Sequence, residues 1–170
     1  SQEVVESKPD GTVTTTVTDK AGNQTETVEQ PDGSSQTTVA NTDGSGSVTT
    51  VSEDGTVEAS VTLPLKSVQE AAETGEAVAL PMPEVPVTTD RASAPTVTVD
   101  LPTGTSAKVE IPVADVTPGT VAVLVHADGS EQVLRTSLTT DTGVIATLDD
   151  GDTVKIVDNS KSFSDVNASR

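Results

Sequence analysis

The segment VEIPVADV at residues 109–116 is echoed earlier in the chain by VTLPLKSV at residues 61–68. Both segments begin with valine, place a proline between two aliphatic residues and end with valine. A second echo follows, because residues 97–101 lie about as far beyond the first segment as residues 144–148 lie beyond the second. We therefore predict one β-rich domain over residues 59–158, built from two related halves at about 59–101 and 107–158.

Residues 1–58 carry a repeat of eleven residues, marked by glycines that four times out of five follow an aspartate. Asp-Gly pairs favour tight turns, and the intervening threonines and valines favour extended chain. The repeat predicts a β-meander of five short strands, each followed by a turn. The alternative is a flexible acidic stalk, because valine alone buries little apolar surface to offset the ordering of the chain. The repeated glycines are Gly11, Gly22, Gly33, Gly44 and Gly55.

The first half of the predicted domain contains a strand at 59–68, interrupted by Pro64, and then a short helix. Ser67 and Glu70 have the spacing of a capping box, which predicts that Ser67 is the N-cap. Gly75 is a natural helix stop. We expect this to be the one helix of the chain. The prolines between residues 81 and 96 predict an irregular connection to the second half.

The second half reads as two hairpins that turn at 128–129 and 150–151, both Asp-Gly pairs. Two-residue turns at these positions set Leu124 opposite Val133 and Ile145 opposite Ile156. The sequence as a whole predicts a mainly β protein, in which the repeat meander is followed by a β-sandwich-like domain with one short helix.

Composition excludes several classes of partner. The net charge is −18 and only nine residues are basic, whereas nucleic-acid binding needs clustered Lys and Arg. No apolar run approaches the ~20 residues that a membrane-spanning helix requires. The chain has no cysteine, so thiolate metal sites and disulfides are excluded. We expect neither nucleic-acid binding nor a membrane span.

The chain carries no recognisable catalytic constellation. His126 is the only histidine, and the predicted turn places it opposite Glu131 as a surface pair. Serine-hydrolase, zinc-protease and phosphate-loop motifs are missing. We therefore expect no catalytic residue and no cofactor. The one candidate metal site is calcium at Asp149, Asp150 and Asp152, and the alternative there is a solvated acidic turn.

The segment SFSDVN at residues 162–167 resembles the opening of an S-layer homology domain, in which Phe-x-Asp-Val precedes the first helix. Upstream, the Thr/Asp-Gly repeat, TPGTVAVLV at 117–125 and GDTVKIVDNS at 151–160 are similar to Firmicutes surface proteins in which such domains follow directly. The resemblance implies a linker and domain start at 159–170, and anchoring of the parent protein to a cell-wall polymer. No binding residue of that family can be assigned to this chain.

These observations lead to an expected function. We expect a non-catalytic, extracellular module of a Gram-positive cell-surface protein that acts as a spacer or presenting scaffold. One alternative is an adhesin or carbohydrate-binding module for a host or glycan ligand, although the chain lacks the Trp and Tyr that sugar sites favour. Another alternative is an accessory domain of a cell-wall hydrolase.

Overall fold

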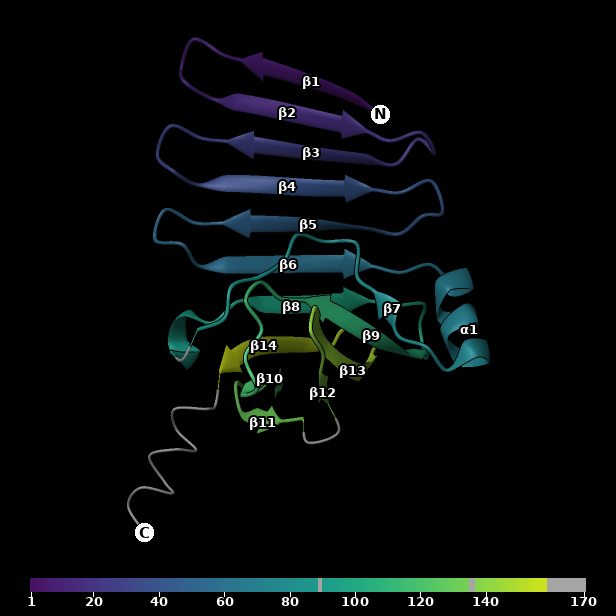
Figure 1. Ribbon diagram of the computed structural model, residues 1–170. Helices are drawn as coiled ribbons and strands as arrows, with labels where there is room; N and C mark the ends of the chain where they lie inside the picture. Colours follow the sequence, from purple (N-terminus) through teal and green to yellow (C-terminus); the bar gives the residue numbers. More distant parts are fainter. Residues whose placement is uncertain (89, 135–136, 159–170) are drawn as a thin grey trace.

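The computed structural model describes residues 1–88, 90–134 and 137–158. Within these residues the protein is mainly β, with a ten-stranded sheet, a four-stranded sheet and one short α-helix (Figure 1). The large sheet has the order β1-β2-β3-β4-β5-β6-β8-β14-β10-β11, and the small sheet has the order β12-β13-β9-β7. The predicted β-sandwich-like fold with a repeat meander is confirmed.

The large sheet consists of β1 (Gln2–Ser7), β2 (Val13–Thr18), β3 (Gln24–Glu29), β4 (Ser35–Ala40), β5 (Gly46–Val51), β6 (Val57–Thr62), β8 (Thr96–Asp100), β10 (Thr120–Val125), β11 (Glu131–Val133) and β14 (Thr153–Asp158). The small sheet consists of β7 (Val78–Ala79), β9 (Ser106–Pro112), β12 (Leu138–Thr139) and β13 (Gly143–Asp149). The helical segments are α1 (Leu65–Thr74) and a 3-10 turn at Arg91–Ser93.

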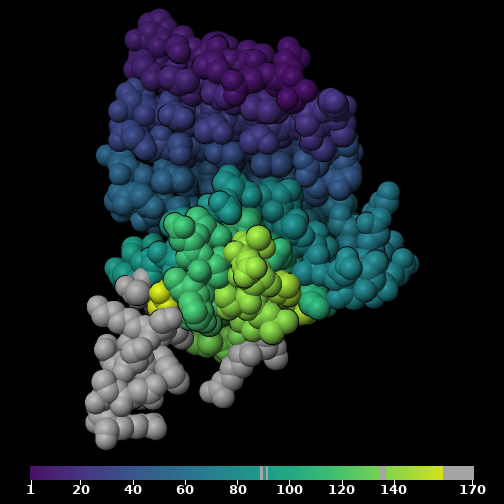
Figure 2. Space-filling model, in the orientation of Figure 1, coloured from purple at the N-terminus to yellow at the C-terminus, as the bar shows by residue number. Residues whose placement is uncertain are grey.

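The repeat region forms the antiparallel meander β1–β6. Each strand has six residues and pairs along its full length, so that Gln2, Thr18, Gln24, Ala40, Gly46 and Thr62 form one row across the sheet. Figure 2 shows the purple and blue repeat strands as a slab that extends away from the green and yellow part of the chain, which contains most of the small sheet and the other end of the large one. The predicted boundary between residues 58 and 59 falls inside β6, and the sheet continues through it.

Each repeat turn is a three-residue loop flanked by one hydrogen-bonded residue on either side, so six strand residues and five connecting residues make up the period of eleven. In the first turn, the Gly11 N–H donates to the Lys8 carbonyl (3.0 Å) and the Lys8 N–H donates to the Thr12 carbonyl (2.8 Å). Gly11 has a φ of 97°, so the loop is a turn closed by a left-handed glycine. The Asp10 carboxylate accepts a hydrogen bond from the Thr12 N–H (2.9 Å) and fixes the loop.

The second layer covers one face of the sheet from β5 onward, where Ser47 and Thr49 are buried, and the buried hydrophobic side chains begin in β6. In β6, Val57, Ala59 and Val61 are buried and alternate with exposed residues. The parallel neighbour β8 places Val97 and Val99 on the same face. The small sheet packs over this face, and α1 packs against β9 and β7. Among the described residues, no buried hydrophobic side chain precedes Val57, so the core lies wholly in the two-layered part.

Helix α1 begins earlier than the capping-box pattern predicts. Pro64 occupies the N-cap position without a side-chain cap, and its carbonyl accepts bonds from the N–H groups of Ser67 and Val68. Ser67 therefore lies in the first turn, and its prediction as the N-cap is wrong. Pro64 has no N–H to continue the strand, so β6 ends at Thr62 rather than near residue 68. The predicted stop at Gly75 is confirmed, with φ 74° and an N–H bond to the Ala71 carbonyl (2.9 Å).

The predicted cross-strand pairs of the second half are wrong. Val123, rather than Leu124, lies opposite Val133, because the turn at 127–129 has three residues and shifts the pairing by one. Ile145 lies opposite Glu110 and Leu138 in the small sheet, whereas Ile156 belongs to the large sheet. The Asp150-Gly151 segment therefore connects the two sheets and does not close a hairpin.

Candidate functional site

The face of the large sheet that points away from the core carries a polar groove. We call this face the outer face. Two hollows of about 360 and 460 Å³ lie there next to each other, because Thr50 and Glu58 line both, and together they are named here the hydroxyl groove. Its lining residues come from the turns after β3 and β5 and from β4, β5, β6 and β8. They are Gln30, Ser34, Ser35, Gln36, Val48, Thr50, Val51, Ser52, Thr56, Glu58, Ala59, Ser60, Thr96 and Thr98.

Strand pairing explains why these side chains converge. Thr50 lies opposite Glu58, and Glu58 in turn lies opposite Thr96, so all three project from the outer face in one row. Glu58 is the only charged residue that lines the groove. The remaining polar groups are hydroxyls and amides, which can both donate and accept hydrogen bonds. This chemistry suits a neutral, hydroxyl-rich ligand such as a saccharide.

Aspartates in the repeat turns support the rim of the groove and are held by backbone N–H and serine hydroxyl donors. The Asp32 carboxylate accepts from the Ser34 N–H (2.9 Å) and the Ser34 hydroxyl (2.6 Å). Asp54 accepts from the Ser52 hydroxyl and from the Thr56 N–H (3.0 Å). The hydrogen bonds from Ser52 and Thr56 lower the pKa of Asp54 to about 2, so this carboxylate is ionised over the whole neutral range.

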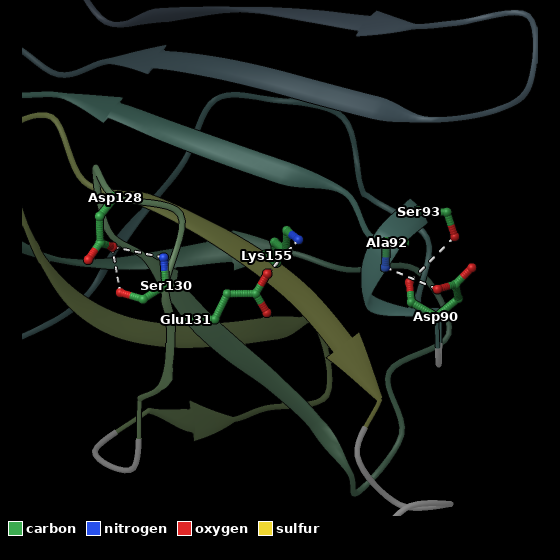
Figure 3. Close-up of polar contacts among 7 residues, drawn as sticks. All are labelled: Asp90, Ala92, Ser93, Asp128, Ser130, Glu131 and Lys155. Atoms are coloured by element: carbon green, nitrogen blue, oxygen red, sulfur yellow. Dashed lines mark hydrogen bonds and ion pairs between the residues drawn. The ribbon is translucent and has the colours of Figure 1, made fainter.

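The structure does not pair His126 with Glu131. The His126 ring nitrogen Nε2 lies 3.1 Å from the Gln132 side-chain oxygen. Glu131 instead forms an ion pair with Lys155 of β14, which lies on the other side of β10, with 2.7 Å between Nζ and Oε2 (Figure 3). The prediction of a His126–Glu131 pair is wrong because the three-residue turn sets Val125, rather than His126, opposite Glu131.

Two of the three aspartate carboxylates of the candidate calcium site accept hydrogen bonds from different backbone groups. Asp150 accepts a hydrogen bond from the Leu101 N–H (3.0 Å), and Asp152 accepts one from the Asp149 N–H (2.8 Å). These bonds hold the corner where the chain passes from the small sheet to the large one. Within residues 1–88, 90–134 and 137–158, no three His, Cys, Asp or Glu side chains are placed to hold a metal ion together.

Sequence reasoning missed the groove because its residues come from three segments of the chain. Thr50 and Gln36 each look like ordinary polar positions of a repeat strand. The available signal was the placement of Gln36 and Thr50 on one face of β4 and β5, but the groove beside them is complete only because β8, which follows β6 by more than thirty residues in the chain, pairs beside β6. The SFSDVN segment at 162–167 lies outside the described residues.

Comparisons with known proteins return no match to a family model, to a curated protein or to a solved structure. In the part of the chain that the structure describes, no helix is both long and apolar enough to cross a bilayer.

Proposed function

We propose that this chain is a non-catalytic extracellular module that acts as a spacer or presenting scaffold on a bacterial cell surface. The observation that supports the proposal is the part of the repeat sheet formed by β1–β4, in which no strand residue is buried and which is hydrogen-bonded without interruption to the sheet of the two-layered part. An antiparallel meander of this kind holds its far end at a fixed distance from its base. The resemblance of 162–167 to the start of an S-layer homology domain supports the surface location.

The arrangement predicts a definite distance between the first and the last strand of the meander. Gln2 in β1 and Thr62 in β6 lie in one cross-strand row, separated by five strand-to-strand steps. At about 4.8 Å per step, the two positions are roughly 24 Å apart. Insertion of a second copy of residues 13–34 adds two strands and two turns in the same phase, and it should increase the separation to roughly 34 Å.

A double-label measurement tests this spacer function. The chain has no cysteine, so Gln2→Cys and Thr62→Cys provide unique sites for spin labels, and pulsed electron spin resonance reports their distance distribution. We expect one narrow peak that moves by about 10 Å on insertion of the extra hairpin. A broad distribution, or a peak that does not move, would refute a rigid spacer. Protease digestion of intact cells that make the native protein separately tests the surface location.

A second candidate function is glycan binding, which the hydroxyl groove favours. Thr50→Val and Gln36→Leu keep the side-chain size but remove hydrogen-bonding groups from the groove. If the groove binds sugars, titration with cell-wall oligosaccharides should shift backbone resonances of β5, β6 and β8, and both variants should weaken the effect. Thr14→Val is the matched control, because Thr14 lies on the outer face of β2, outside the groove. Equal binding by Thr50→Val and the wild type would exclude this function.

A further inference from the structure

An unpaired carboxylate lies at the centre of the hydroxyl groove. Glu58 and Thr50 line both hollows, so Glu58 lies where the two hollows meet. The Glu58 side chain is exposed, and among the described residues no donor is bonded to its carboxylate. The next basic residue along its cross-strand row is Lys155, two strand steps away beyond Thr96. Lys155 is bonded to Glu131, with 2.7 Å between Nζ and Oε2, so the charge of Glu58 is available to a ligand.

The aspartates at the rim of the groove are not equivalent to Glu58. Asp32 accepts two hydrogen bonds within its own turn, from an N–H (2.9 Å) and from a hydroxyl (2.6 Å). Asp54 likewise accepts hydrogen bonds from an N–H and from a hydroxyl of its turn. A cationic ligand at either aspartate would compete with these bonds, whereas at Glu58 it would displace only water. Glu58 is therefore the carboxylate of this region that best accommodates a positive charge.

Neutral groups surround Glu58 on the floor of the groove. Thr96 lies opposite Glu58, and Ser60 follows two residues later on the same face of β6. Within the part of the chain that the structure describes, neither hydroxyl has a hydrogen-bond partner. Val48, which lies opposite Ser60, is 41% exposed. A sugar ring has hydroxyls at its edge and C–H groups on its faces, so it can pack on Val48 while its hydroxyls bond to Ser60 and Thr96.

We propose that the hydroxyl groove binds a saccharide that carries a free ammonium group, as in an amino sugar without an acetyl substituent, and that the Glu58 carboxylate accepts hydrogen bonds from this ammonium. This ligand specifies the glycan-binding function proposed above, on which the inference rests. The hydroxyls alone would suit a neutral saccharide, and the carboxylate adds a preference for a positive charge. A hydrogen bond between two charged groups is stronger than one between neutral groups.

The charge of the whole chain supports the same ligand. The net charge of −18 attracts a cationic saccharide over longer range and repels one that carries phosphate or carboxylate groups. The position of the groove makes it independent of the outer edge of the sheet. Strands β1 and β2 lie between the groove and that edge, so a further strand beside β1 would leave the groove unchanged.

Three β-1,4-linked tetrasaccharides test the proposal, because they differ only in the group at carbon 2 of each ring. At mildly acidic pH that group is an ammonium in the glucosamine tetramer, an acetamido group in the N-acetylglucosamine tetramer and a hydroxyl in the glucose tetramer. In nuclear magnetic resonance titrations of the whole chain, the glucosamine tetramer should bind at least tenfold more tightly than the other two and shift resonances of β5, β6 and β8. Equal affinity for all three would refute the ammonium preference and leave glycan binding standing, whereas no binding of any of them would refute both.

Two matched variants locate the charge that the ligand recognises. Glu58→Gln keeps the size of the side chain and removes its charge, so it should reduce the preference for the glucosamine tetramer to less than twofold. Glu6→Gln is the control for the charge of the whole chain, because Glu6 lies in the same cross-strand row, five strand steps from Glu58 and outside the groove. It should keep the full preference. If both variants lose the preference equally, or if Glu58→Gln retains it, the groove is not the site.

Discussion

The substitution Ile111→Ala tests whether the contact between the two sheets is the main source of stability. Ile111 lies in β9, has 0% exposure and packs in the cluster that joins the small sheet to β6, β8 and β14. The change removes three buried carbon atoms and leaves a cavity that the flanking strands close only partly. Such substitutions cost about 2–5 kcal/mol, against a typical total stability of about 5–15 kcal/mol for a domain.

Urea unfolding followed by far-ultraviolet circular dichroism is the suitable assay, because the chain contains neither Trp nor Tyr for fluorescence. With a slope of about 2 kcal/mol per molar urea, the midpoint of Ile111→Ala should fall by about 1–2.5 M. Val5→Ala is the control: Val5 is 58% exposed on β1, and its truncation should change stability by less than about 0.5 kcal/mol. If the two variants unfold at the same urea concentration, the inter-sheet core does not govern stability.

Two further outcomes follow from the turns and the strand pairing. A Cβ at Gly143 would lie 2.0 Å from the Ile111 carbonyl oxygen, so Gly143→Ala should lower the free energy of unfolding in urea by about 3 kcal/mol or more. Gly33 has open space around it but a φ of 94°, so Gly33→Ala should lower the same free energy by only about 1–2 kcal/mol. The folded pKa of Asp54, about 2, lies below its ordinary 3.8, so its contribution to the turn is fully present above about pH 4 and is lost as the pH falls toward 2. The Thr56 amide resonance should report this loss on acid titration, and a variant Asp54→Asn with the same titration curve would contradict it.

Local signals in the sequence predicted the repeat region well. The glycine spacing marks each turn, and in the structure all five repeat glycines adopt a φ between 91° and 97°. Pairing between neighbours in the chain requires only such turns and strand-forming residues, so the meander follows from the sequence. Likewise Gly75 ends the helix because its left-handed conformation lets its N–H reach the Ala71 carbonyl.

The prediction of strand pairing failed where the length of a turn was misjudged. Asp128-Gly129 looks like a two-residue hairpin turn, but the structure places Ala127 in the loop and bonds the His126 N–H to the Ser130 carbonyl (2.8 Å). One extra loop residue shifts the pairing by one position and reverses which face each partner occupies. The repeat turns have the same form, with the Asp carboxylate bonded two residues ahead in both Asp10 and Asp128. The period of eleven leaves five residues between six-residue strands, and this spacing was the signal in the sequence for the three-residue loop.

The echo between 61–68 and 109–116 predicted strands but not their partners. The first segment contains the end of β6, which pairs with β8 in parallel, and then the start of helix α1. The second segment contains the end of β9, which extends to Pro112 and pairs with β13 in antiparallel orientation. Pro64 follows the last sheet bond of β6, so the chain is free to turn into a helix there. Pro112 is the last residue of β9, where its carbonyl still accepts the Val85 N–H (3.0 Å). Equivalent local sequences thus end differently because their neighbours in space differ.

The change along one cross-strand row, from Thr27 and Thr49 to Ala59 and Val97, helps to explain how a single chain forms both an uncovered sheet and a packed domain. β3 places Thr25 and Thr27 on the face where β6 places Ala59 and Val61. Threonine favours extended backbone as valine does, but its hydroxyl tolerates water, so a strand of threonines needs no covering layer. Strands can therefore be added to the repeat sheet without enlarging the core. Each added hairpin increases the distance between the outermost repeat strand and the two-layered part, and the two-layered part retains its stability. A spacer requires this property.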